Sequence, residues 1–194
     1  MKVVASGRQE RDEVEAEVSA LLDGFQFDHV EYLIPEPLLE SGLTRGSGFE
    51  HAEAGVRLVR ADGGCRTVRW FQRGEEEGLW IGAELATDES GWVPAVAPVV
   101  ADSWETRGLG NRIARSVVSW QQLAPSRTSV WSIRLDLEGG AVAIALGESD
   151  YESRTPTYIP DCVIVIFDPN VGRGYRPVAS ANSAWALGGA ESDG

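Results

Sequence analysis

Cysteine, histidine and lysine are all scarce in this chain of 194 residues, and no apolar run approaches the length that spans a bilayer. The cysteines, Cys65 and Cys162, lie far apart, and neither belongs to a CxxC-type pair. The histidines, His29 and His51, have no second histidine or cysteine nearby at the spacing of a zinc site. The sequence therefore predicts no metal and no cofactor, and it leaves open whether the two cysteines meet.

Basic residues are outnumbered by acidic ones, and the formal net charge is −13 at pH 7. Such a chain is repelled by the phosphate backbone of nucleic acids, so we expect no direct nucleic-acid binding. An acidic surface can instead steer a basic protein partner. The first residues contain no apolar core of a signal peptide before the charged segment 9–13, so we expect a cytoplasmic protein with no membrane association.

The stretch 129–168 is the most informative part of the sequence for the fold. From Trp131 to Glu138, apolar and polar residues alternate strictly, which predicts a strand with one buried face. A two-residue loop at Gly139–Gly140 then aligns the apolar residues of the next strand on the same face, with Leu137 opposite Val142, Leu135 opposite Ile144 and Ile133 opposite Leu146. A third strand over 162–167 is apolar on both faces and belongs inside the sheet.

The remaining patterns complete the predicted fold. Apolar spacing indicates helices over 10–24 and 109–124, and further strands over 27–34, 56–60, 66–71 and 79–85. Pro94 and Pro98 make 86–101 an edge strand or an extended loop, and 36–54 reads as a loop with one helical turn at 37–40. We therefore predict an α+β domain over 1–177, with a largely antiparallel sheet of about six strands, two principal helices and a loose tail over 178–194.

Arginines gather in the ribbon 57–73, which contains a single acid, Asp62. Arginine forks suit phosphate and carboxylate groups, so Arg57, Arg66, Arg69 and Arg73 are candidate anion-binding residues of a small-molecule-binding domain. The alternative interpretation is that these arginines pair with the chain's own glutamates on a solvated face.

A third class of function, an enzyme, rests on the acidic loop after the predicted hairpin. Glu148, Asp150 and Asp161 could act as an acid or a base if that loop folds into a cleft. No histidine joins them and no nucleophile motif is present, so we assign no catalytic residue and expect a protein that is not an enzyme.

The leading hypothesis is a non-enzymatic intracellular bacterial interaction protein, such as an acidic inhibitor or an immunity-type partner of a basic toxin or nuclease. Its predicted contacts lie in two acidic loops, the first with three consecutive glutamates and the second with a tryptophan: Glu75, Glu76, Glu77, Asp88, Glu89 and Trp92. The sequence does not predict an oligomeric state.

Overall fold

The protein is mainly β in the computed structural model, which describes residues 4–41, 46–83, 95–150 and 152–186. Within these ranges the strands are β1 (Val4–Ala5), β2 (His29–Pro35), β3 (Phe49–Glu53), β4 (Gly55–Val59), β5 (Cys65–Arg73), β6 (Glu76–Gly82), β7 (Val96–Val100), β8 (Ile113–Ala124), β9 (Arg127–Leu137), β10 (Gly140–Leu146), β11 (Glu148–Ser149), β12 (Pro156–Thr157) and β13 (Val163–Ile166). The helices are α1 (Arg8–Leu22), the 3-10 helix η1 (Glu36–Ser41), α2 (Ser103–Thr106) and α3 (Pro169–Gly174).

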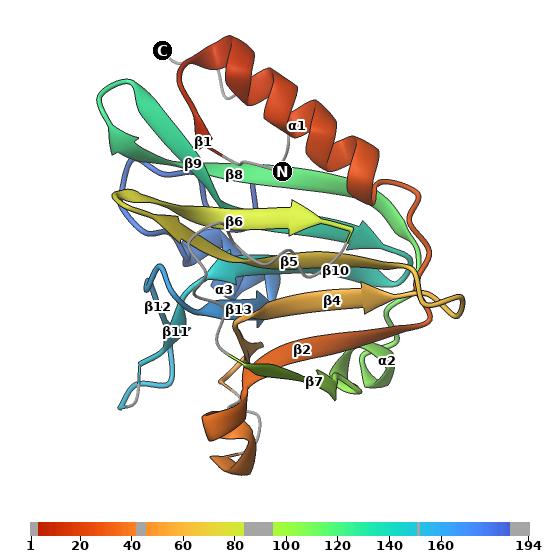
Figure 1. Ribbon diagram of the computed structural model, residues 1–194. Coiled ribbons are helices and arrows are strands. Elements are labelled where there is room, and N and C mark those ends of the chain that lie inside the picture. Colours follow the sequence, from red (N-terminus) through yellow and green to blue (C-terminus); the bar gives the residue numbers. More distant parts are fainter. Residues whose placement is uncertain (1–3, 42–45, 84–94, 151, 187–194) are drawn as a thin grey trace.

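Eleven strands form one mixed sheet in the order β1-β9-β10-β13-β3-β2-β4-β5-β6, with β8 beside β9 and β7 beside β2. Among the described strands of this sheet, only β2 and β3 pair in parallel, at Leu33 and Glu53. The sheet curls until it is nearly closed, because β6 packs against β9 (Figure 1). An ion pair between Glu76 of β6 and Arg127 of β9 bridges this closure.

The chain bends sharply between β3 and β4, so these two consecutive strands take different positions in the curled sheet. β3 lies between β13 and β2, whereas β4 lies between β2 and β5. Glu53, at the bend, has a left-handed φ of 50°, which is uncommon for a residue other than glycine. A Cβ at Gly55 would lie 2.5 Å from the carbonyl oxygen of Val68, so glycine allows β5 to approach this closely.

The hairpin of β9 and β10 is confirmed, but its predicted register is wrong by two residues. The loop is Glu138–Gly139, and Leu137 therefore faces Gly140, while Leu135 faces Val142. Gly139 has a φ of 83°, which a glycine adopts without steric cost. Because the error is an even number of residues, the buried faces still coincide. The strand β13 lies between β10 and β3 and is buried along its whole length, as predicted.

Helix α1 is confirmed and lies across β8 on the outside of the sheet (Figure 1). Val14, Val18 and Leu22 form its buried stripe, at the four-residue spacing that keeps side chains on one face. The indole Nε1 of Trp120 in β8 donates to Glu15 Oε1 (2.7 Å) at the edge of this contact. The buried apolar side chains of α1 and of the curled sheet belong to one cluster.

The α+β prediction with a largely antiparallel sheet of six strands and two principal helices is wrong. The segment 109–124 contains no helix in the structure, because Ile113–Ala124 is strand β8, paired along its length with β9. The segment 36–54 is not only a loop with a helical turn, because it also contains β3. β7 pairs with β2 alone among the described strands, which fits the edge position predicted from Pro98.

The packed part of the chain extends past residue 177, the predicted end of the domain. Ala184 and Trp185 are buried, and Trp185 packs against Gly172 of α3. The hydroxyl of Ser119 in β8 donates to the Ser183 carbonyl (2.7 Å). Residues 187–194 lie outside the described ranges. No helix in the described part of the chain combines the length and the apolar character needed to cross a membrane.

Candidate functional site

The three glutamates predicted to contact a partner have different surroundings. The β5–β6 turn is shorter than predicted, because β6 already begins at Glu76. Glu75 is exposed in that turn, but Glu76 pairs with Arg127, and Glu77 accepts the hydroxyl of Tyr158 (2.5 Å). Glu76 therefore bridges the sheet closure, and Glu77 is engaged with a segment outside it. The other predicted contacts, Asp88, Glu89 and Trp92, lie outside the described residues.

The candidate anion-binding arginines do not form one row. Arg57 donates through Nε to Glu31 Oε2 (2.6 Å), as the alternative interpretation of internal pairing predicts. Arg69 is 7% exposed, and its guanidinium carbon lies 5.1 Å from the ring centroid of Trp80. Arg66 lies three residues before Arg69 in β5 and so points to the opposite face of the strand. The side chain of Arg73, at the end of β5, is outside the described part of the structure.

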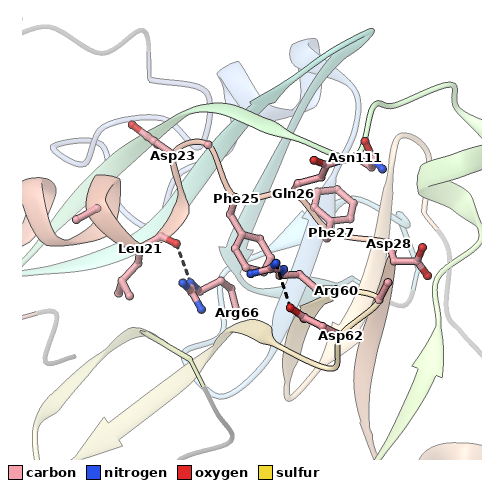
Figure 2. Close-up of a pocket in the computed structure, with 13 residues that line it drawn as sticks. Leu21, Asp23, Phe25, Gln26, Phe27, Asp28, Arg60, Asp62, Arg66 and Asn111 are labelled. Atoms are coloured by element: carbon pink, nitrogen blue, oxygen red, sulfur yellow. Dashed lines mark hydrogen bonds and ion pairs between the residues drawn. The ribbon is translucent and has the colours of Figure 1, made fainter.

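Arg66 instead lines a pocket of about 600 Å³ at the C-terminal end of α1. Three separate segments form the pocket: the end of α1 with the residues that follow it to Asp28, the β4–β5 turn with Arg66 at the start of β5, and Asn111 before β8. Figure 2 shows Arg66 reaching the end of α1 beside the ring of Phe25. A volume of this size is in the range of small-molecule sites, which is about 300–1,000 Å³.

The guanidinium of Arg66 is held in a fixed orientation. Its Nε donates to the Leu21 carbonyl (2.8 Å), and its Nη1 donates to the Cys65 carbonyl (3.0 Å). Its carbon lies 4.7 Å from the ring centroid of Phe25. This arrangement places a positive charge at the negative end of the α1 dipole, where it is stabilising. It also leaves N–H groups of Arg66 available to a ligand, because a guanidinium carries five.

Three aspartates also line the pocket, and their side chains have different partners. Asp62 forms an ion pair with Arg60 (3.0 Å), and both side chains are more than half exposed. Asp23 accepts the backbone N–H and the hydroxyl of Ser116 through Oδ1 (both 2.7 Å). Asp28 is 64% exposed, and its carboxylate lies 3.4 Å from the ring nitrogen of the neighbouring His29. The pocket thus contains charges of both signs.

A buried polar network, which the sequence analysis missed, lies under β2, β3 and α2. Glu50 of β3 is 2% exposed, and its Oε2 accepts the hydroxyls of Tyr32 (3.0 Å) and Ser103 (2.5 Å). The Trp104 indole donates to the Tyr32 oxygen (3.2 Å). Burial, together with the charge of Glu50, raises the pKa of Tyr32 above its ordinary value. The network is closed to solvent, so its role is to fix α2 against the sheet.

The acids considered for an enzyme have different surroundings in the structure. Asp150 accepts the backbone N–H and the hydroxyl of Ser153, and these bonds hold the pKa of Asp150 below its ordinary value. Asp150 therefore stabilises a turn. Glu148 and Asp161 lie near the thiol of Cys162. Burial of this thiol, together with the negative charges of Glu53, Asp161 and Glu148, raises its pKa to about 12. A thiol with such a pKa is a poor nucleophile at neutral pH.

Both ring nitrogens of His51 are engaged in internal hydrogen bonds. Its Nε2 accepts the N–H of Ser149 (2.5 Å), so this nitrogen carries no proton, and Nδ1 donates to Glu53 Oε1 (3.2 Å). Cys65 and Cys162 are both free thiols. In the described residues, no group of three or more histidine, cysteine, aspartate or glutamate side chains is arranged to hold a metal ion.

The pocket at the end of α1 is a concave site that contains charges of both signs. Sequence reasoning identified Arg66 but not Phe25 or Asp28, because no local pattern connects the segments that form the pocket. Comparison of the chain with protein-family models, with curated proteins and with solved structures finds no match.

Proposed function

We propose that this chain is a non-enzymatic interaction protein of the bacterial cytoplasm that binds and inhibits a partner with a basic surface, such as a toxin or nuclease. The net charge of −13 supports a basic partner rather than nucleic acid or an anionic membrane surface. The engagement of Cys162 and His51 in internal contacts supports a binding role over an enzymatic one.

The observation that carries the proposal is the outer face of α1. The helix contains five acidic residues and two arginines, and all five acids are exposed: Glu10, Asp12, Glu13, Glu15 and Glu17. Its buried stripe faces β8 (Figure 1), so the exposed acids lie on the rest of the helix surface, where Glu15 also accepts the indole N–H of Trp120 in β8. Glu76 and Glu77 make internal contacts, so we place the proposed contact surface on α1 instead of the β5–β6 turn. Glu75, which is exposed in that turn, is a further candidate.

Charges on such a face act mainly on the rate of association. Exposed charges are screened beyond about 8 Å at physiological ionic strength, so the attraction weakens as salt is added. Complementary charges speed diffusional encounter and suppress partners of the wrong sign. An inhibitor of this kind associates rapidly at low salt and is released as salt rises.

The experiment is affinity capture of the tagged chain from its native host at low salt, followed by elution at high salt and identification of the eluted protein. The association rate of the purified pair is then measured for two double variants that change the net charge equally. Glu13→Lys with Glu17→Lys reverses charge on α1, and Glu36→Lys with Glu40→Lys reverses it on η1, at the opposite end of the molecule (Figure 1). All four side chains are exposed, and each pair has the same spacing in sequence.

We expect the α1 variant to lower the association rate by about tenfold at low salt, and the η1 variant to change it much less. We also expect the natural chain to suppress the activity of its partner at a one-to-one ratio. A stoichiometric partner that is not basic, or equal effects of the two variants, would contradict the proposal.

A further inference from the structure

The hairpin of β11 and β12 forms a small sheet of its own, separate from the eleven-stranded sheet, and extends away from it in Figure 1. In the described residues of 148–157, one hydrogen bond reaches the main sheet: the backbone N–H of Ser149 donates to Nε2 of His51 in β3 (2.5 Å). The chain on either side of the hairpin is anchored separately, because the Gly147 N–H donates to the Cys162 carbonyl and the Tyr158 hydroxyl donates to Glu77. The hairpin is therefore a flap with two fixed ends and one hydrogen bond to the sheet.

His51 accepts this hydrogen bond only while its ring is neutral. Its side chain is 10% exposed, and its Nδ1 donates to Glu53 Oε1 (3.2 Å), so Nε2 is the nitrogen with a free lone pair. A second proton therefore binds at Nε2, and both nitrogens of the resulting imidazolium are donors. The new N–H then faces the N–H of Ser149, and their hydrogen bond is lost. Glu53 holds Nδ1 in both states, so the ring stays in β3.

The charges around His51 do not oppose a positive ring. The ionised groups at this corner of the sheet all act on the thiol of Cys162, and all are acids: Glu53 on β3, Glu148 on β11 and Asp161 before β13. The thiol itself stays neutral at physiological pH, because its pKa is about 12. The remaining charged residues of the hairpin lie in its turn, at Asp150, Glu152 and Arg154. Hydrogen bonds from Ser153 hold the pKa of Asp150 below its ordinary value, so this turn keeps its structure while a histidine titrates.

We propose that protonation of His51 releases the hairpin of β11 and β12 from β3, and that this hairpin is a pH-sensitive flap. The docked hairpin requires the neutral ring, whereas the released hairpin accepts either form. Release is thus coupled to the uptake of one proton, and the ratio of docked to released hairpin falls by up to about tenfold for each pH unit of acidification. Histidine is the side chain that ordinarily titrates between about pH 5 and 8. This inference is independent of the proposed partner contact on α1.

The test follows the full chain by ¹⁵N NMR between about pH 8 and pH 5. The ring nitrogens of His51 report its tautomer and its protonation, and the amides of 148–157 report the position of the hairpin. We expect the Nδ1–H tautomer at the alkaline end, and we expect the Ser149 amide to shift with the same midpoint as the ring. The hydrogen-exchange protection of that amide should fall about tenfold or more across the transition. A Ser149 amide that keeps its shift and protection while His51 titrates would overturn the proposal, and so would a ring that stays neutral down to about pH 5.

Three variants assign the transition to one histidine. His51→Gln cannot be protonated, and its side-chain oxygen can still accept the Ser149 N–H, so we expect its hairpin to stay docked over the whole pH range. Glu53→Gln covers the case in which His51→Gln is unfolded: it removes a negative charge beside the ring and should move the midpoint to lower pH. His29→Gln is the matched control, because His29 also lies in a strand beside two carboxylates (3.4 and 3.3 Å), but in β2, and it should leave the transition unchanged. A transition that persists in His51→Gln, or one whose midpoint does not respond to Glu53→Gln, would refute the role of His51 and leave the proposal for α1 intact.

Discussion

Replacing Tyr32 by phenylalanine tests the buried network under α2. The ring still fills its site, but Glu50 loses one of its two hydroxyl donors and the Trp104 indole loses its acceptor. A buried hydrogen bond to a charged group contributes about 1.5–3 kcal/mol, and a buried donor left without a partner costs about 1–3 kcal/mol. Because these effects overlap, we expect a loss of about 3 kcal/mol, a large fraction of the roughly 5–15 kcal/mol of a typical domain.

Tyr175→Phe is the matched control for this measurement. Tyr175 is also buried and packs against Trp131, but its hydroxyl donates only to the Leu146 carbonyl (2.6 Å). Loss of one neutral hydrogen bond should cost about 1 kcal/mol. Urea unfolding of the two variants and the natural chain gives both values, provided that the denaturant slope stays constant. A loss for Tyr32→Phe no greater than for Tyr175→Phe would refute the reasoning about Glu50.

Three further predictions concern stability. The pKa of Cys162 is about 12 in the folded state, against an ordinary value of about 8.5, so the folded state binds more protons between these values and stability falls as pH rises through them. Cys162→Ala should make this alkaline loss shallower in pH-dependent urea unfolding, and an unchanged slope would contradict the shift. Trp185→Ala should cost about 3–5 kcal/mol by the same assay, because the ring is 7% exposed, whereas an effect near zero would show that residues 181–186 are not packed. Asp23→Ala should cost about 1–2 kcal/mol more than Asp23→Asn, which keeps an acceptor for Ser116, and equal losses would argue against those bonds.

The sequence predicted the elements whose apolar residues recur at a regular spacing or form a continuous run, and it missed strands β8 and β3, whose apolar and polar residues follow no strand period. In α1 one face is buried. In β9 the apolar residues alternate with polar ones, so the period is visible in the sequence, but the predicted single buried face is wrong because every residue from Ser129 to Leu135 is buried. In β8 the consecutive residues from Ser116 to Gln121 are all buried, and the register against β9 shifts at three points. These irregularities removed the period of two and left Ile113, Val117 and Trp120 at a spacing that imitates a helix.

Strand β3 was missed for a different reason. Its sequence, Phe-Glu-His-Ala-Glu, contains polar residues that normally indicate a loop, yet Glu50 and His51 are buried. Burial is possible because Tyr32, Ser103 and Ser149 supply hydrogen bonds from distant parts of the chain. The pocket was missed for the same reason: Arg66 alone could be identified as a candidate, whereas its aromatic neighbour Phe25 comes from the segment after α1.

Closure of the curled sheet has a consequence for the order of folding. Val4 and Ala5 pair with Ser129 and Thr128, and Asn182 donates its backbone N–H to the carbonyl of Trp120 (3.3 Å). Both ends of the described chain thus dock on β8 and β9, which are synthesised late. During translation the apolar stripe of α1 stays uncovered until β8 has been synthesised, because β8 is the element with which α1 makes most of its contacts. Pairings at this separation in sequence slow folding, so we expect refolding in the range of milliseconds to seconds. We also expect the nascent chain to depend on chaperones until residues near 186 have left the ribosome.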